Sequence, residues 1–286
     1  MSRLLAYIGN DPERVQCALH AGRNQLVATT VRADAWGVGF YQGGEVLLRR
    51  RPKPPDGPVD FYELAAEIRT DVLIGHVRAG TVGPPRNENT HPFRFRSWLF
   101  AHHGTVTAFD QVQAPLLAAI PDFLRRNIRG QTDSEHLFHL FLSFLHEAGK
   151  LDDPIVGPAD AASALGSAIS LVERLCREAG AGPPELQVAA SNGRILLAAR
   201  RGAPMHIYRV RGIRDCPVCR EKSGEPEPEG RGTRIRPVDH DLLRAIVIVA
   251  DATAPVGAPW EEIPERHVVT VSHELETIVR PLDAAA

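Results

Sequence analysis

The sequence predicts an α+β fold in which two groups of antiparallel strands pack as sheets face to face, with helices outside. Short apolar runs bounded by turn residues occupy residues 3–104 and occur again in 186–271. Two longer segments with helical periodicity lie between these groups. Because no linker divides the 286 residues, we expect a single domain over 1–286 with an inserted loop at about 211–237.

The composition is that of a soluble globular chain. Hydrophobic residues make up 43% and charged residues 24%, and the formal net charge is −2. No basic field therefore points to nucleic acid or an anionic membrane as a partner. No apolar run approaches the roughly 20 residues that cross a bilayer, and no signal peptide is recognisable. With four cysteines and no disulfide framework, we expect a cytoplasmic protein without a cofactor.

The first part of the chain predicts strands and a short helix. An apolar strand starts at Leu4, while Asp11 and Pro12 suit the cap and first turn of a helix. The runs 36–41 and 45–49, separated by a glycine turn, predict a hairpin.

Polar side chains follow two later apolar strands at the point where each ends. Arg78 follows the run that starts at Asp71, and His103 and Gly104 follow the run that starts at Trp98. A scaffold of strands fixes such groups while the neighbouring loops stay accessible, so strand ends favour the formation of a site.

Two helices are predicted in the middle of the chain. The first is capped by Thr132 or Asp133, and its apolar stripe consists of Leu137, Phe141, Phe144 and Leu145. We expect its histidines to be solvated or partly packed: His136, His139 and His146. The second helix runs from about residue 160 to residue 177, and its stripe consists of Leu165, Ile169, Val172 and Cys176.

The inserted loop contains a pair of cysteines, Cys216 and Cys219. Two such thiolates can share a Zn²⁺, but a structural zinc site needs four ligands and no second pair exists. Three interpretations stay open: an unliganded loop, which is our expectation, a metal site completed by His206, His240 or a second subunit, or a redox pair. We expect the thiol of Cys17 to be a small buried hydrophobe.

Ser2 carries both a hydroxyl group and, if Met1 is removed, a free α-amine. An α-amine has a pKa near about 8, so its neutral form could take the hydroxyl proton as an intramolecular base. By itself the pattern is better explained by a common residue in front of a buried strand. Its meaning depends on which other residues surround it.

Several motifs accompany Ser2 along the chain: WGVGFY at 36–41, GHVRAGTVG at 75–83, ENTHPF at 88–93, FAHHGTV at 100–106 and QTDSE at 131–135. In order and spacing they resemble the class II glutamine amidotransferase domain, a branch of the N-terminal nucleophile hydrolases, and above all its small stand-alone members. The resemblance covers roughly the first half of the chain. It implies a four-layer αββα sandwich of two antiparallel sheets.

The resemblance also implies roles for individual residues. Arg78 matches the arginine that pairs with the α-carboxylate of glutamine, and Asp133 matches the aspartate that receives the α-ammonium group. Thr81 and His91 match positions that line or support the glutamine pocket. Without the resemblance, the structural interpretations are preferred: Arg78 as an ion-pair residue, His91 as a hydrogen-bonded loop histidine and Asp133 as a helix cap.

Two positions depart from the family pattern, and both carry chemistry. Ser2 stands where the family has a nucleophilic cysteine, and a hydroxyl is far less acidic than a thiol. His103 stands where the family has the asparagine of an Asn-Gly oxyanion pair, whose glycine matches Gly104. A neutral imidazole donates from only one nitrogen at a time.

Three hypotheses follow. In the first, the protein is an amidohydrolase that attacks glutamine or a γ-glutamyl amide through Ser2, with His103 and Gly104 holding the oxyanion. In the second, it is a catalytically impaired member that binds such a ligand as a regulatory or partner subunit. In the third, Ser2 is an engineered replacement for a cysteine. The expected ligand is a small-molecule amide, and a synthase partner or a homo-oligomer stays open.

Overall fold

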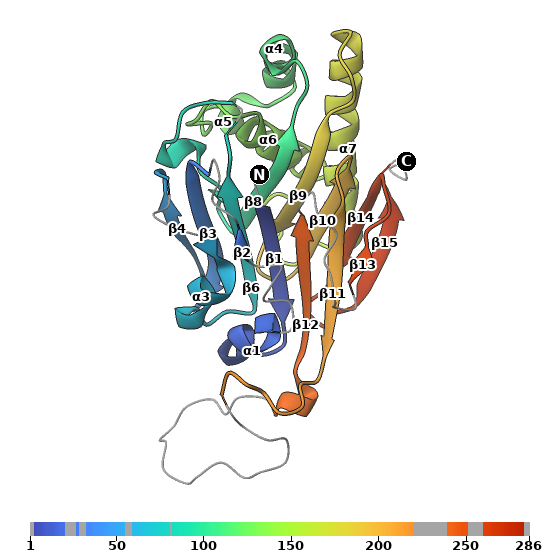
Figure 1. Cartoon of the computed structure of the whole chain (residues 1–286). Helices are drawn as coiled ribbons and strands as arrows, with labels where there is room; N and C mark the ends of the chain where they lie inside the picture. The colour runs from blue at the N-terminus through green and yellow to red at the C-terminus, as the bar shows by residue number, and fades with distance from the viewer. Residues whose placement is uncertain are drawn as a thin grey trace.

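Two antiparallel sheets stacked face to face form the centre of the protein, and helices cover the outer face of each (Figure 1). The computed structural model describes residues 3–20, 27–28, 33–54, 59–80, 82–219, 239–250 and 260–282. The predicted αββα sandwich is confirmed. Within these residues, no helix is long and apolar enough to cross a membrane.

In the described part of the chain, the first sheet has seven strands and the second has six, and all neighbours pair antiparallel. The order of the first is β13 (Glu261–Glu262), β11 (Met205–Arg211), β12 (Arg244–Ala250), β1 (Arg3–Gly9), β6 (Val72–Arg78), β3 (Ala35–Gln42) and β4 (Glu45–Arg51). The order of the second is β15 (Thr277–Pro281), β14 (His267–Val271), β10 (Leu196–Arg201), β9 (Glu185–Ser191), β8 (Trp98–Thr105) and β7 (Phe93–Phe95). A separate pair consists of β2 (Val27–Ala28) and β5 (Val59–Asp60).

Helices form the outer layers. The first sheet is covered by α1 (Val15–His20), which follows the 3₁₀ helix η1 (Pro12–Arg14), and by α3 (Phe61–Leu64), which continues into η2 (Ala65–Glu67). The second sheet is covered by α4 (Phe109–Ala118), α5 (Asp122–Arg125), α6 (Asp133–Glu147) and α7 (Pro158–Glu178). Two short 3₁₀ helices lie in loops: η3 (Asn87–Asn89) and η4 (His240–Leu242).

The central position of β1 explains why its sequence is a continuous apolar run. Leu4, Ala6 and Ile8 belong to the core between the two sheets, while Leu5 and Tyr7 belong to the core under α1. All five side chains are fully buried. A strand covered on both faces needs apolar side chains at every position, because successive side chains point to opposite faces.

The glycine of β3 at position 39 lets the two sheets approach closely. A Cβ atom there would lie 2.9 Å from a methyl carbon of Leu99, which is a β8 residue of the other sheet. On the opposite face of β8, Trp98 packs edge-to-face against Phe141 of α6, and Phe100 stacks on Phe138 of the same helix. Alternate residues of β8 therefore contact different layers: Leu99 packs against the other sheet, while Trp98 and Phe100 pack against α6.

Differences from the predicted elements have identifiable causes. The helix α4 was not predicted, because only Val112 and Leu116 of it are buried and Pro115 lies inside it. The expectation for the histidines of α6 was wrong for His136 and His139, which are buried, and holds for the exposed His146. The helix is buried on nearly all sides rather than along one stripe, because neighbouring helices pack on it as well as the sheet.

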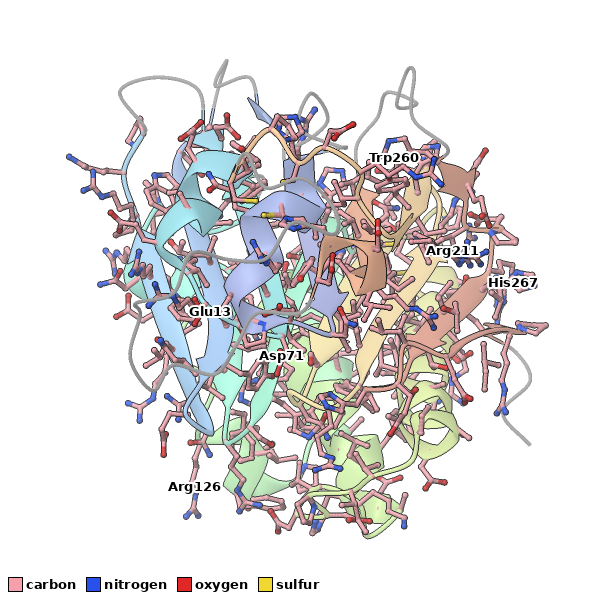
Figure 2. All side chains as sticks on the ribbon, turned by 90° about the horizontal axis from the view of Figure 1, so that it is seen from below. Glu13, Asp71, Arg126, Arg211, Trp260 and His267 are labelled. Carbon is pink, nitrogen blue, oxygen red and sulfur yellow. The ribbon has the colours of Figure 1, made fainter. Side chains whose placement is uncertain are left out.

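Charged side chains surround this layered body, as Figure 2 shows from the end that carries α1. The labelled Arg126 and Arg211 are both exposed. In Figure 1, β11 runs down to this same end, and β12 starts there and runs back up, directly after η4 in the chain.

Candidate functional site

A pocket lies where the ends of β6 and β8, from opposite sheets, meet the first turn of α6. Five of the residues predicted from the sequence line it: Arg78, His91, His103, Gly104 and Asp133. They come from four separate segments of the chain. The fold therefore brings these five residues into one pocket, whereas the sequence shows only their order along the chain.

Strand alternation explains which side chains reach this pocket. In β6, Val72 and Ile74 face the other sheet, so His76 and Arg78 share that face. In β8, Leu99 and Ala101 face inward across the same gap, so the following residue of that series is His103. The pocket is therefore the polar end of the layer between the sheets.

Arg78 is buried, with 4% of its surface exposed, and is held at three points. Its Nη1 donates to Asp34 Oδ2 at 2.6 Å, and its Nη2 donates to the carbonyl oxygens of Val82 and Gly83 at 2.7 and 2.6 Å. These contacts use three of the five N–H donors of a guanidinium. The ion pair with Asp34 places a negative charge beside Arg78 and orients its planar group.

Asp133 is the first residue of α6, and Thr132 is the cap: the Thr132 side chain accepts a hydrogen bond from the backbone N–H of Glu135. The Asp133 carboxylate accepts from the backbone N–H of Val106 at 2.8 Å and from that of Ser134 at 2.8 Å. A carboxylate at a helix N-terminus is favoured by the helix dipole. Asp133 therefore supplies a buried negative charge to the pocket.

His76 and His91 form a ring pair at the base of the pocket, with centroids 4.2 Å apart. Both side chains are buried, and none of their four ring nitrogens has a hydrogen-bond partner among the described residues. Burial lowers the pKa of each imidazole well below its usual value, and the neighbouring histidines add to this. Among the described residues His91 is therefore not hydrogen-bonded, and both rings are neutral at physiological pH.

His102 connects β8 to the start of α6. Its Nε2 donates to the carbonyl of Glu185 at 3.1 Å, which leaves Nδ1 to accept from the Ser134 hydroxyl at 2.9 Å. Burial lowers the pKa of His102, although the nearby Asp133 carboxylate works in the opposite direction. This pair fixes the position of Ser134 next to Asp133.

Gly104 occupies a position that no other residue fits. Its φ is +128°, and a Cβ atom would lie 2.0 Å from the carbonyl oxygen of Glu185 on β9. The β8–β9 register places His103 opposite Gln187 and Gly104 opposite Leu186. The adjacent His103 is half-buried and lines the pocket.

The loop that carries His91 is fastened from two sides. The Asn89 side chain donates to the carbonyl of Pro84 at 2.8 Å and accepts from the backbone N–H of Gln131 at 2.8 Å. A Cβ atom on Gly37 would lie 2.3 Å from the carbonyl oxygen of His91, so a glycine in β3 makes room for this loop. The motifs WGVGFY, ENTHPF and QTDSE therefore meet beside the pocket.

Two of the predicted site residues, Ser2 and Thr81, lie outside the described residues. Their neighbours in the chain are placed. Arg3 is the first residue of β1 and pairs with Val77, the residue before Arg78. The described chain therefore begins beside the strand end that carries Arg78.

A family model for class II glutamine amidotransferases matches residues 1–212. The chain belongs to this family. Its predicted membership, and with it the N-terminal nucleophile hydrolase type of fold, is confirmed.

Relatives within the class II family differ in how much of the chain they match. A γ-glutamyl-hercynylcysteine sulfoxide hydrolase of Mycobacterium tuberculosis is 25% identical over 270 residues, which cover 93% of this chain and 87% of the relative. A probable glutamine amidotransferase of Saccharomyces cerevisiae is 31% identical over 167 residues, which cover 52% of this chain. The match spans less than half of that yeast relative, 47%.

Solved class II structures show the same fold. A class II domain protein from Silicibacter pomeroyi superimposes with a TM-score of 0.59 at 24% identity, covering 98% of this chain and 99% of that one. Glutamine phosphoribosylpyrophosphate amidotransferase from Bacillus subtilis gives a TM-score of 0.54 at 16% identity, covering 99% of this chain and 49% of that one. The second comparison shows the whole chain corresponding to about half of a larger enzyme.

Sequence reasoning missed four residues that shape the site of this class II member: Asp34, His76, His102 and Ser134. Three of them lie inside the motifs already noted, within two positions of residues that were singled out. Asp34 had no such signal, because its ion pair with Arg78 joins two segments 44 residues apart.

Proposed function

We propose that this class II family member is an amidohydrolase that cleaves glutamine or a γ-glutamyl amide with Ser2 as its nucleophile. The observation that carries the proposal is the convergence of Arg78, Asp133 and the His103-Gly104 pair on one pocket. The register of Arg3 against Val77 adds to it. We therefore propose that Ser2, the residue before Arg3 in the sequence, acts at this strand end.

The ligand's α-amino acid group matches the charges of the pocket. Arg78 keeps two N–H donors beyond its three contacts, one on Nε and one on Nη1, and its positive charge favours a carboxylate. Asp133 offers a carboxylate to the ammonium group. Thr81 and His91 are proposed to complete the pocket wall, with the neutral His91 ring contributing shape rather than charge.

The proposed reaction proceeds through an acyl-enzyme. The α-amine of Ser2 takes the hydroxyl proton while Oγ attacks the amide carbonyl, and the Gly104 N–H and the His103 side chain stabilise the oxyanion. The C–N bond then breaks, and the proton passes to the leaving amine. Water adds to the ester with the α-amine again as base, which releases the γ-carboxylate and restores the hydroxyl.

The relatives favour a γ-glutamyl compound as substrate. The mycobacterial relative that covers 93% of this chain is named for hydrolysis of a γ-glutamyl derivative. We therefore place hydrolysis ahead of transfer of ammonia to an acceptor.

The strands after residue 212 support the proposal of one domain over 1–286. β12 lies between β11 and β1 in the first sheet, and β14 and β15 extend the second sheet from β10. Removing them would expose the core under α1 and the core between the sheets.

The alternative is a binding subunit that retains the anchors without the reaction. It is favoured by the presence of Ser2 and His103 at positions where the resemblance implies a cysteine and an asparagine. Losing one oxyanion donor costs about a hundredfold to a thousandfold in turnover in a protease. A serine nucleophile with a weakened oxyanion site would then bind its ligand and turn it over slowly.

The test begins with the mass of the intact protein, which shows whether Met1 is removed. Hydrolysis of L-glutamine and of γ-glutamyl-p-nitroanilide is then measured for the parent, Ser2→Ala and Ser2→Cys. We expect a free Ser2, activity in the parent and its loss in Ser2→Ala.

Retained Met1, or equal rates in the parent and Ser2→Ala, would exclude the serine mechanism. Activity that appears only in Ser2→Cys, together with ligand-induced thermal stabilisation of the parent that Arg78→Ala abolishes, would establish the binding subunit instead.

A further inference from the structure

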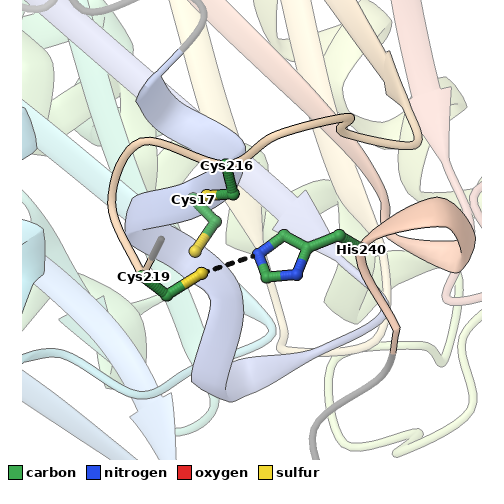
Figure 3. Close-up of side chains that lie close together, drawn as sticks. All are labelled: Cys17, Cys216, Cys219 and His240. Carbon is green, nitrogen blue, oxygen red and sulfur yellow. Dashed lines mark hydrogen bonds between the residues drawn. The ribbon is translucent and has the colours of Figure 1, made fainter. Parts of the chain in front are cut away.

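Four potential metal ligands gather at the end of the molecule opposite the pocket. The thiols of Cys17, Cys216 and Cys219 and the imidazole of His240 have ligand atoms that all lie within 4.8 Å of one another. Figure 3 shows the three sulfur atoms and the ring arranged around a common centre. The closest pair is Cys219 Sγ and His240 Nε2, 3.1 Å apart.

These ligands come from three elements that the fold holds together. Cys17 lies on α1, the cysteine pair follows β11, and His240 begins η4 immediately before β12. The backbone N–H of Ile213 donates to the carbonyl of His240 at 2.8 Å, so the two ends of the inserted loop are joined next to the cluster.

The cluster has the dimensions of a tetrahedral site. With Zn–S bonds of about 2.3 Å, ligand atoms at the corners of a tetrahedron lie about 3.8 Å apart. The four ligand atoms lie within 4.8 Å of one another, so binding an ion requires them to approach by up to about 1 Å. Cys17, Cys216 and His240 are buried, at 4%, 1% and 2% exposure, and Cys219 is half-buried, so a bound ion would be shielded from water.

We propose that Cys17, Cys216, Cys219 and His240 bind one Zn²⁺ as a structural Cys₃His site. Four protein ligands close a tetrahedral zinc, leaving no position for a substrate, which is the arrangement of a structural rather than a catalytic metal. Three thiolates and one imidazole select a soft or borderline cation over magnesium or calcium. The site fastens the inserted loop to α1 and to the start of β12.

This assignment changes two expectations from the sequence. The insert is not an unliganded loop, and Cys17 is a ligand rather than only a buried hydrophobe. Of the additional ligands considered, His240 belongs to the cluster and His206 does not. Cys17 could not be recognised from spacing, because the fold alone brings α1 to the inserted loop.

Metal content tests the proposal independently of any activity. Protein purified without a metal-affinity tag is analysed by plasma mass spectrometry, and we expect about one zinc ion per chain. The metal is removed with a chelator under reducing conditions, and the chain is reloaded with Co²⁺ alone. We expect thiolate-to-cobalt charge-transfer absorption and the intense d–d bands of a tetrahedral ion.

Variants identify the ligands. Cys17→Ser, Cys216→Ser and His240→Ala should each lose most of the bound zinc, while His240→Cys, which still offers four ligands, should retain it. Cys176→Ala is the matched control, because this fully buried thiol on α7 lies outside the cluster. Chelation should lower the midpoint of thermal unfolding of the parent and of Cys176→Ala, but not of Cys17→Ser.

Two results would overturn the proposal. One is a disulfide among these cysteines in protein handled without reductant. The other is reduced, folded protein that gives no cobalt spectrum and takes up no zinc.

Discussion

Arg78 illustrates how one residue serves the fold and the site at once. Its guanidinium donates hydrogen bonds to Asp34 and to the carbonyls of Val82 and Gly83. Arg78 is therefore a structural ion-pair residue as well as a pocket residue. The same contacts hold the remaining donors in a fixed direction beside the pocket. A ligand carboxylate would share the cation with Asp34, which weakens the ligand's attraction to Arg78.

At this scale we predict that Asp34→Asn lowers the stability of the ligand-free protein and tightens the binding of L-glutamine, by on the order of tenfold. The amide removes the competing charge, so the ligand carboxylate compensates Arg78 alone. Isothermal titration and thermal unfolding with and without L-glutamine measure both effects. Asp122→Asn, which removes an exposed ion pair with Arg125, is the control. If Asp34→Asn bound L-glutamine more weakly, the prediction would be wrong, and the effect of Asp34 on ligand binding would be to orient Arg78.

At the scale of elements, β8 links the candidate oxyanion residues to the helix that carries Asp133. His102 binds the Ser134 hydroxyl on one face of the strand, while His103 points to the other face. Gly104 then ends the regular part of the strand with its positive φ. The geometry of the pocket therefore depends on the backbone of three consecutive residues.

We predict that Gly104→Ala destabilises the protein by more than about 2 kcal/mol, since it combines a strained φ with an overlap against Glu185 that only a backbone shift relieves. Urea unfolding measures the loss. Gly182→Ala is the matched control, because a Cβ atom there meets nothing within 4 Å. Equal stability of the two variants would mean that β8 and β9 separate easily at this point.

For the molecule as a whole, the buried histidines couple stability to pH. Burial lowers the pKa of five of them: His76, His91, His102, His136 and His139. In the unfolded chain a histidine binds its proton below about pH 6.5, whereas the folded protein keeps these rings neutral to lower pH. Their contribution to the unfolding free energy is therefore complete above about pH 6.5 and is lost as the pH falls toward their folded pKa values.

His139 allows a quantitative test, since burial lowers its pKa to about 4. The unfolding free energy of the parent falls when the pH is lowered from about 7 to about 5. We predict that this fall is smaller by roughly 2 kcal/mol in His139→Asn, which has no imidazole to protonate at this position. Asparagine retains a donor for the carbonyl of Glu135, which His139 Nδ1 contacts at 2.9 Å. Urea unfolding at both pH values gives the difference. The control is His146→Asn, because His146 is exposed on the same helix, and we expect its unfolding free energy to change with pH as that of the parent does. If the unfolding free energy of His139→Asn also changed with pH as that of the parent does, the prediction would be wrong.

Much of the fold could be predicted because the signals were local. The run from Leu4 to Ile8, the glycine turn after Gln42 and the stripe ending at Cys176 all correspond to observed elements. The helix α4 escaped prediction because its apolar face is weak. The burial of His139 escaped it because the sequence does not show what packs on the polar side of a helix.

The sequence by itself determined many of the elements, the family and five of the residues that line the pocket, since hydrophobic periodicity and short motifs are properties of neighbouring residues. Those five residues are Arg78, His91, His103, Gly104 and Asp133. Only the tertiary structure decided that Asp34 pairs with Arg78, that His76 stacks on His91 and that Cys17 joins the cysteine pair of the insert. These contacts join segments far apart in the chain, and they exist only because sheet register and layer packing bring the segments together.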